Sequence, residues 1–331
     1  MIKRDESMRA RSNRLTALLA LFAALTLTVT ACSSPEEDSG NGAPIQVNTP
    51  MGPVTINGVP KNIVTIGTQW TDVALAFGVT PVAYLDNVEL LTKAPTPWVG
   101  DRLESSEAID PSRDVASQVA AVDPDLIVST DFGDQTETFA KLSKLAPTIP
   151  SITGKQVDPW EEMVVFMGTV LREPEKAQQI IDGVNSKIDG IKQANPGLAG
   201  KSFALAWILT NDQIQVFGDP ADGAAEVFTS MGMTMAPELQ KIFERDGQPR
   251  FPISTENVPE LQSDMMILAA NSPALNEKMK TLPGYSALTS VKKNAVAELS
   301  VAEVSAINQP SPLSLPFVLE KMTPAFENAA K

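Results

Sequence analysis

The side chains that could carry chemistry in this 331-residue chain are restricted in kind. Histidine is absent, and the chain has one cysteine, four tryptophans and two tyrosines. Histidine is the commonest general base and transition-metal ligand, so its absence, together with a single thiol, argues against nucleophilic triads and zinc sites. The scattered aspartate and glutamate pairs are typical of a solvated surface. We therefore do not expect an enzyme, and we expect no resident cofactor or metal.

The one cysteine, Cys32, lies at a sharp change of composition. An apolar run without charge, residues 15–31, precedes it, and Arg9, Arg11 and Arg14 stand upstream of that run. A basic segment, an apolar run and small residues form the layout of a secretory signal peptide. Residues 29–32, Val-Thr-Ala-Cys, resemble a bacterial lipobox, whose cysteine is acylated and becomes the first residue of the mature protein.

This motif predicts that residues 1–31 are a lipoprotein signal peptide and that Cys32 carries the lipid. More than one acyl chain is needed for stable anchoring, and bacterial lipoproteins carry two or three. A plain signal peptide and a spanning helix are the alternatives, since the run approaches the roughly 20 residues of a span. From Met8 onwards the leader is purely basic, so we expect initiation at Met8 rather than Met1.

Charge and length limit the partners of the remaining chain. The net charge is −14 at pH 7, and the signal segment removes five basic but only two acidic residues, so the mature protein is more acidic still. Nucleic acid is therefore not an expected partner. About 300 residues favour two domains. The polar stretch 32–45 is expected to be a flexible tether, and we expect a monomer held outside the cytoplasmic membrane by its lipid or free in the periplasm.

Short apolar runs and helical patterns alternate along most of the chain, which predicts α/β units with parallel sheets. Strands are expected at 59–67, 81–85, 202–208 and 213–218, and helix-then-strand units at 112–130 and 255–270. Between the two series, residues 158–171 and 174–195 have helical periodicity without a strand. Asp158, Pro159 and Glu161 predict a capping-box-like helix start there.

The pattern predicts an N-terminal α/β lobe at 46–157, a helical linker at 158–195 and a C-terminal α/β lobe at 196–331. The two lobes look like repeats of one unit. When residues 119–128 are placed over 258–267, Asp125 meets Asp264, and an apolar strand follows both.

Several segments, taken in order, resemble a known family. They are VPKNIVTIG, TDVALAFGVTPVAY, VDPDLIVST, WEEMVVFMGTVLREPEKAQQIIDGV, VFGDPADGAAEVFTSMGM and STENVPELQSDMMIL. They are similar to the substrate-binding proteins of ABC importers for iron-siderophores, a family that includes cobalamin and haem binders. The resemblance covers about residues 50–327. It implies two Rossmann-like lobes with parallel sheets joined by a long linker helix, a ferric siderophore bound in the cleft, and delivery to a membrane permease.

The cleft implied by this family should be lined by loops after the strands, where α/β sheets bind ligands. The expected ligand-binding residues are Thr68, Gln69, Trp70, Trp98, Arg102, Phe132, Trp207, Arg250, Asn308 and Gln309. Rigid aromatics with a few polar groups suit a bulky ligand that is partly apolar and has peripheral oxygens. Trp207 lies inside an apolar run, so a core position is the alternative for it.

The family also implies a glutamate on each lobe that pairs with arginines of the permease. Glu256 has the C-terminal position, eight residues before Asp264. Its N-terminal counterpart is Ser117, a departure from the family pattern, and Asp114 lies one turn earlier. Either Asp114 substitutes for the glutamate or the contact is lopsided.

Other functions remain open at this point. Haem would need an axial ligand; Tyr84 and Tyr285 are the only tyrosines, and methionine is the alternative ligand. Cobalamin can be held by shape and stacking. An envelope scaffold lipoprotein without a small-molecule ligand is the alternative from a different class, and the missing N-lobe glutamate favours it.

Overall fold

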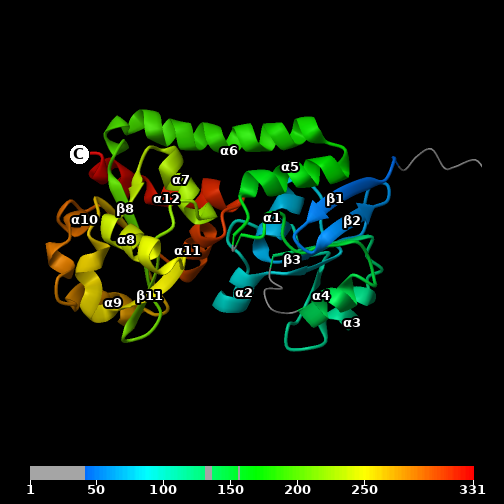
Figure 1. The fold of residues 1–331 in the computed structure, drawn as a ribbon, viewed down its shortest axis with the longest axis horizontal. Coiled ribbons are helices and arrows are strands. Elements are labelled where there is room, and N and C mark those ends of the chain that lie inside the picture. The colour runs from blue at the N-terminus through cyan, green and yellow to red at the C-terminus, as the bar shows by residue number, and fades with distance from the viewer. Residues whose placement is uncertain (1–41, 131–135, 156) are drawn as a thin grey trace, which may run out of the picture. The chain divides into compact units, whose positions relative to one another are not determined.

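A computed structural model of the chain describes residues 42–130, 136–155 and 157–331. Cys32, Phe132, the expected signal peptide and most of the expected tether lie outside the described residues. Residues 41–331 form one compact unit. Figure 1 shows two groups of strands flanked by helices, with the long helix α6 (Pro174–Ala194) running past both groups. Within the described ranges, no helix combines the length and apolar character that a bilayer span requires.

The first sheet consists of five parallel strands. In spatial order they are β5 (Glu107–Ala108), β4 (Ala83–Leu85), β3 (Ile63–Ile66), β6 (Leu126–Ser129) and β7 (Thr148–Ile149). Strands β3 and β6 are buried along their whole length, as expected for a parallel sheet covered on both faces. The helices of this lobe are α1 (Thr68–Ala76), α2 (Asn87–Thr92), α3 (Val115–Ala120) and α4 (Thr136–Leu142).

A separate antiparallel hairpin, β1 (Ile45–Thr49) and β2 (Gly52–Ile56), comes before the first sheet. Its first strand starts at Ile45, where the sequence predicted the tether to end. The alternating half-buried and exposed residues of β1 show that only one face of the hairpin is covered.

The second sheet has a parallel centre and an antiparallel edge. Its order is β11 (Arg250–Ser254), β9 (Gln213–Phe217), β8 (Ser202–Ile208), β12 (Met265–Ala270) and β13 (Val296–Leu299), and β10 (Thr234–Met235) also pairs with β8. Strand β9 runs antiparallel to both of its neighbours, β8 and β11, whereas a parallel pattern was predicted. The four residues between β8 and β9 are too few for a parallel crossover and can only close a hairpin.

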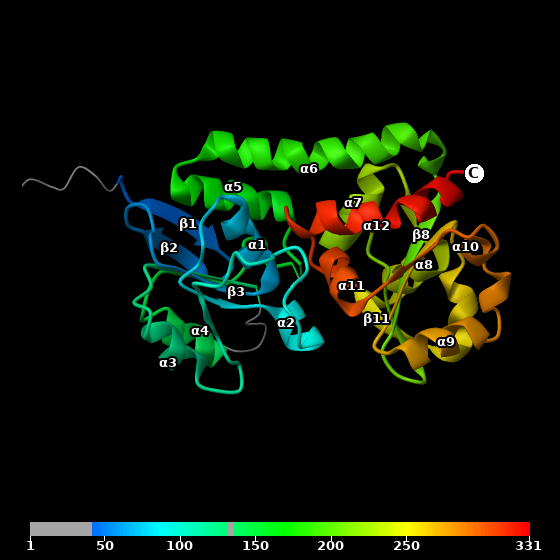
Figure 2. The ribbon, with the colours of Figure 1, turned by 180° about the vertical axis from the view of Figure 1, so that it is seen from behind.

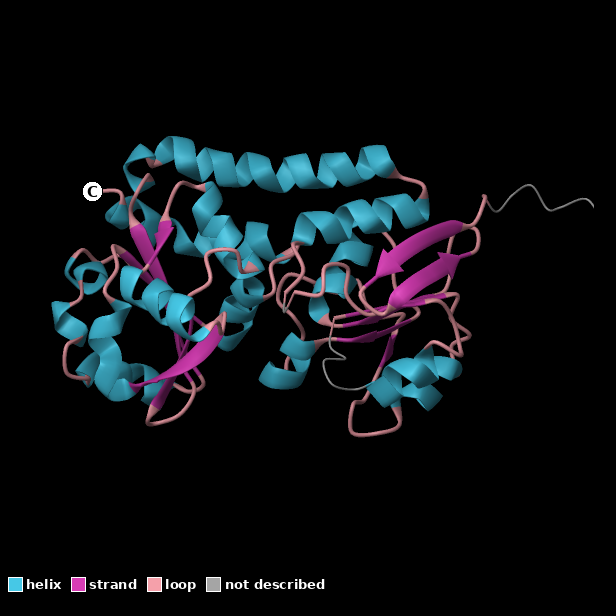
Figure 3. Ribbon diagram, viewed as in Figure 1, coloured by secondary structure: helices cyan, strands magenta, loops and turns pink. Residues whose placement is uncertain are grey.

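Helices cover the second sheet on both sides, as Figure 3 shows. They are α7 (Gly223–Ser230), α8 (Pro237–Asp246), α9 (Pro273–Thr281), α10 (Thr289–Lys292), α11 (Val301–Asn308) and α12 (Ser314–Ala329), with 3-10 turns η1 (Pro196–Leu198), η2 (Thr255–Leu261) and η3 (Tyr285–Ala287). The helix expected at the start of 255–270 is the 3-10 turn η2, which contains Pro259, a residue without an N–H for a helical hydrogen bond.

Two helices link the lobes. Helix α5 (Trp160–Leu171) is followed by α6, and Figure 2 shows α6 lying alongside elements of both lobes. Helix α6 buries Ala177, Ile181, Val184 and Ile188, one apolar face with helical spacing. The predicted capping box at the start of α5 is wrong. The carboxylate of Asp158 instead accepts from the backbone N–H groups of Ile152 and Thr153, at 2.9 Å each, and so closes the preceding loop.

The two aspartates that aligned in the sequence have the same structural role. Asp125 precedes β6 and accepts hydrogen bonds from the backbone N–H groups of Lys61 and Asn62, just before β3. Asp264 precedes β12 and accepts from the N–H and hydroxyl of Ser202, at the start of β8. Each aspartate therefore fixes the register of two adjacent parallel strands at their amino ends. The protein is an α/β protein with two Rossmann-like lobes joined by a long helix.

Candidate functional site

Asp86 organises the carboxyl edge of the first sheet. It follows β4, is 4% exposed, and caps α2 by accepting from the backbone N–H of Val88 at 2.8 Å. The same oxygen accepts from the hydroxyl of Thr68 at 2.8 Å, and the other oxygen from the hydroxyl of Thr96 at 2.6 Å. Thr68, an expected ligand residue, is therefore buried and held in place by Asp86.

A cavity of about 260 Å³ opens at this edge. Its lining residues are Tyr84, Asp86, Glu89, Leu90, Lys93, Ala108 and Ile109. The Tyr84 hydroxyl donates to Glu89 at 3.2 Å, and burial, with the neighbouring Glu89 charge, raises the pKa of Tyr84 to about 12. The residues after the expected strand 81–85 have the position at which parallel sheets bind ligands. None of the residues that line this cavity, however, was among the predicted ligand residues.

The first turns of α1 meet the loop that joins α11 and α12. Gln69 donates through Nε2 to the carbonyl oxygen of Pro310 at 2.7 Å. The hydroxyl of Ser311 donates to Asp72 Oδ2 at 2.5 Å, and the indole N–H of Trp98 donates to the same oxygen at 2.7 Å. The Trp98 ring also packs on Phe317 of α12, with centroids 5.7 Å apart. We call these contacts the interlobe seam.

Asp72 is the centre of the interlobe seam. Its side chain is 0% exposed, and its second oxygen, Oδ1, is buried without a hydrogen-bond partner. Burial raises the pKa of Asp72 to about 8, although the hydrogen bonds from Ser311 and Trp98 act in the opposite direction. No local pattern around this aspartate indicates a contact between the lobes, so its role in the seam was missed.

Two more of the expected ligand residues of the first lobe have structural contacts. Trp70 was expected on a loop, but it lies within α1, is 0% exposed, and packs edge-on against Phe166 of α5, with centroids 5.5 Å apart. Arg102 is exposed, and its guanidinium donates to the carbonyl oxygens of Trp98 and Val99. Arg102 therefore braces the loop that carries Trp98.

In the second lobe, Trp207 lies near the carboxyl end of β8 and is half-buried, so it is neither fully in the core nor on an open loop. Its indole N–H donates to the side-chain oxygen of Asn271, just after β12, at 2.9 Å. The amide nitrogen of Asn271 in turn donates to the carbonyl oxygen of Leu209 at 3.2 Å. These residues form a polar cluster at the carboxyl ends of two adjacent parallel strands.

Arg250 is occupied by an ion pair. It donates through Nε and Nη2 to the two oxygens of Asp222, both at 2.8 Å, and Nη2 also donates to the carbonyl oxygen of Asn308 at 3.0 Å. The two paired side chains are only 15% and 3% exposed. Asn308 and Gln309 are half-buried and lie directly before Pro310 of the interlobe seam. The guanidinium fork that was expected to bind a ligand oxygen therefore holds the start of α7 instead.

The two expected docking acids have different surroundings. Asp114 caps α3 by accepting from the backbone N–H of Ser117 at 2.7 Å, and its other oxygen is 3.9 Å from Lys141 Nζ. The Ser117 hydrogen bond is the main cause of a lowered Asp114 pKa. Glu256 lies in the first turn of η2 and is exposed, and its carboxylate has no hydrogen-bond or ion-pair partner among the described residues.

Comparison with known proteins identifies relatives of the whole two-lobe unit. The chain is 23% identical over 301 residues to the Fe(3+)-citrate-binding protein YfmC of Bacillus subtilis (strain 168), which covers 87% of this chain and 90% of YfmC. A periplasmic solute binding protein from Mycobacterium smegmatis str. MC2 155 has a TM-score of 0.71 at 24% identity and covers 89% of this chain and 100% of its own.

A third relative is PiaA of Streptococcus pneumoniae TIGR4, crystallised in complex with ferrichrome. It has a TM-score of 0.71 at 21% identity and covers 86% of this chain and 98% of its own. The family model described as "Periplasmic binding protein" matches residues 113–302, more than half of the chain. The protein described here belongs to this family of binding proteins.

Proposed function

We propose that the protein captures a ferric siderophore at the carboxyl edges of its two sheets and delivers it to the permease of an ABC importer. The observation that carries the proposal is the pair of polar and aromatic sites at those edges, one around Tyr84 and Asp86 and the other around Trp207 and Asn271. The names of the relatives support it, because YfmC binds Fe(3+)-citrate and PiaA was solved with ferrichrome.

The size of the first-lobe cavity favours a ligand shared between the lobes. At about 260 Å³ it lies below the roughly 300–1,000 Å³ typical of ligand pockets, so a siderophore that fills it would also contact the second lobe. Lys93 at its rim supplies a cation for a carboxylate or catecholate oxygen. Trp207 and Asn271 supply an aromatic face and an amide from the other lobe. Among the residues expected from the sequence, we retain Trp207, Asn308 and Gln309 as direct contacts.

Haem is less well supported than a siderophore. Tyr84 and Tyr285 are the only tyrosines, and both are buried, at 9% and 7% exposed. Burial raises the pKa of each phenol, which disfavours the phenolate that would ligate haem iron. Cobalamin needs only shape and stacking, so it stays the second candidate ligand.

A titration of purified residues 41–331 tests the proposal. Tryptophan fluorescence would be followed during addition of ferric citrate, ferrichrome, haem and cobalamin. Saturable quenching by a ferric siderophore, lost in Trp207→Ala and kept in Trp160→Phe, is the expected result. Saturation by cobalamin alone would move the ligand to that class. No response to any of the four would favour a scaffold lipoprotein without a small-molecule ligand.

We also propose that Cys32 anchors the mature protein to the outer face of the membrane as a lipoprotein. The support is the lipobox-like sequence before it and the acidic, polar stretch after it. Metabolic labelling with a fatty-acid analogue should mark the wild-type protein and leave Cys32→Ala unlabelled and unprocessed. A Cys32→Ala protein that is processed normally and stays on the membrane would rule out the lipid anchor.

A further inference from the structure

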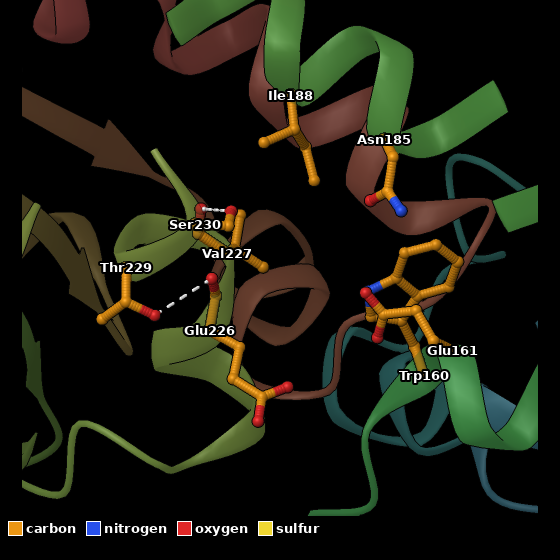
Figure 4. A pocket seen from close by; sticks show the side chains of 8 residues that line it. All are labelled: Trp160, Glu161, Asn185, Ile188, Glu226, Val227, Thr229 and Ser230. Atoms are coloured by element: carbon orange, nitrogen blue, oxygen red, sulfur yellow. Dashed lines mark hydrogen bonds between the residues drawn. The ribbon is translucent and has the colours of Figure 1, made fainter. Parts of the chain in front are cut away.

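A cavity of about 370 Å³ lies beneath α6, apart from the sites at the carboxyl edges of the sheets. Its lining residues are Trp160, Glu161, Asn185, Ile188, Glu226, Val227, Thr229 and Ser230. Figure 4 shows Trp160 and Glu161 of α5 on one side, the residues of α7 on the other, and Asn185 and Ile188 of α6 above them. Three helices from distant parts of the sequence thus build one pocket, whose volume is within the range of small-molecule sites.

The cavity has an apolar wall that carries one unsatisfied donor. Trp160, Ile188 and Val227 are all buried. The Trp160 side chain is 3% exposed, and its indole N–H makes no hydrogen bond in the structure although it lines the cavity. An indole N–H can only donate, so it can bind only a group that offers an acceptor atom. An acceptor oxygen that enters the cavity would satisfy it.

The cavity also contains two carboxylates without a partner. Neither Glu161 nor Glu226 has an ion pair or a hydrogen bond to another residue's side chain within the described part of the chain. Partial burial raises the pKa of both carboxyl groups, and the negative charges of nearby acidic side chains raise it further. Lys155 is the one cation that acts on Glu226, whereas Glu162 and Asp222 add further negative charge. The cavity therefore has a negative potential that its own residues leave unbalanced.

A metal ion is a poor candidate to balance this potential. Among the described residues, no group of three or more acidic or cysteine side chains has the arrangement of a metal site. The apolar wall of Trp160, Ile188 and Val227 also offers a hydrated ion nothing to contact. A cation with an apolar body matches both halves of the cavity.

We propose that this cavity binds a small organic cation, namely an alkylammonium ion that also carries an oxygen acceptor. The ammonium group would lie between Glu161 and Glu226, the carbon chain against Ile188 and Val227, and the oxygen would accept from the Trp160 N–H. Helix α5 packs on α1 through Phe166 and Trp70, and α7 packs on β8 through Phe228 and Phe203, with centroids 4.6 Å apart. The bound cation would therefore connect the two lobes on the α6 side.

The experiment uses three probes of equal chain length on purified residues 41–331: 4-aminobutan-1-ol, butylamine and butan-1-ol. Binding would be measured by calorimetry at constant ionic strength and by the indole N–H signals in ¹H–¹⁵N spectra. We expect 4-aminobutan-1-ol to saturate and to shift one indole signal, which Trp160→Phe removes. Butan-1-ol has no ammonium group to contact the carboxylates, so it should bind at least about tenfold more weakly than 4-aminobutan-1-ol. Butylamine should bind, more weakly than the amino alcohol, without the same indole shift.

Matched variants locate the site. Glu161→Gln and Glu226→Gln should each weaken the amino alcohol by about tenfold, because each removes a charged partner. Glu162→Gln removes the neighbouring acid of α5, which is exposed and outside the cavity lining and acts on the cavity only through its charge, so it should weaken binding less than either of the other two variants. An equal loss in Glu162→Gln, no saturation by the amino alcohol, or equal binding of Mg²⁺ to the wild type would each overturn the proposal. Siderophore binding by these variants is a separate measurement, so failure here leaves the carboxyl-edge site untouched.

Discussion

Asp72 Oδ2 accepts a hydrogen bond from the hydroxyl of Ser311 at 2.5 Å, although 239 positions separate the two residues in the sequence. Asp72 lies on α1 of the first lobe, and Ser311 precedes α12 of the second. Both side chains are 0% exposed. A buried polar contact of this kind loses little to solvent competition, so it fixes how the two lobes meet.

Removal of the Ser311 hydroxyl should destabilise the protein. In Ser311→Ala, Asp72 Oδ2 keeps only the Trp98 donor, and the buried carboxyl has one partner fewer. The expected loss is about 1–3 kcal/mol in the free energy of unfolding, measured by urea denaturation. Ser305→Ala is the matched control, because the Ser305 hydroxyl donates to Val301 within its own helix. Equal stability of the two variants would show that the seam contributes nothing.

The Asp72 carboxyl should make stability depend on pH. Its pKa is raised from 3.8 to about 8 in the folded protein, so folding favours the protonated form. This contribution is complete below the unfolded pKa, declines as the pH rises through the interval from 3.8 to about 8, and is then constant. Asp72→Asn keeps an oxygen that can accept from Trp98 and Ser311 but cannot ionise. The variant should therefore gain stability relative to the wild type as the pH rises.

Urea denaturation of both proteins at the two ends of that interval checks this. The stability difference between Asp72→Asn and wild type should shift in favour of the variant at the alkaline end. A difference that is the same at both ends would mean that Asp72 does not change its protonation state there. Comparison with the wild type is needed because Glu161, Glu226 and Glu260 also have raised pKa values and titrate in both proteins.

Two tryptophans that the sequence proposed as ligand contacts should behave differently. Trp98 is 8% exposed, donates to Asp72 and packs on Phe317, so Trp98→Ala should lose about 3 kcal/mol of stability. Trp207 is half-buried at the carboxyl end of β8, so Trp207→Ala should lose less stability and more ligand affinity. Thermal unfolding and siderophore titration of both variants separate these effects. The reverse order would place the ligand at the seam.

Patterns within one segment were sufficient to predict much of the fold. The apolar face of α6 could be predicted because its residues recur at helical spacing, and the equivalence of Asp125 and Asp264 because the two lobes repeat one unit. The contacts of these aspartates, with residues 62 to 64 positions away, could not be predicted from local spacing. The partner of Asp158 was misassigned because its carboxylate binds the loop before it and not the helix after it. The antiparallel edge of the second sheet was predictable, because the strands expected at 202–208 and 213–218 leave a loop of four residues, which is long enough only for a hairpin.

The candidate site was less predictable than the fold. Asp72, Gln69 and Arg250 each have a partner that lies tens to hundreds of residues away, and no local pattern indicates which one. Position after a parallel strand indicated Thr68 correctly as a residue of the carboxyl edge, but not that Asp86 would hold it. Polar residues at strand ends can be found from sequence, whereas their division between ligand contacts and internal contacts depends on packing.

Docking onto a permease should depend mainly on Glu256. Its carboxylate is exposed and without a partner among the described residues, whereas Asp114 is engaged with the Ser117 N–H and lies near Lys141. Charges at the rim of an interface govern the rate of association and the register of the two proteins. Glu256→Arg should therefore abolish uptake of labelled siderophore in a complemented deletion strain. The affinity of the purified protein for the siderophore should stay unchanged. Asp114→Asn should reduce uptake less. Ser117→Glu, which places an acid at the position the family pattern implies, should maintain or raise it. Normal uptake by Glu256→Arg would remove the docking role and strengthen the scaffold alternative.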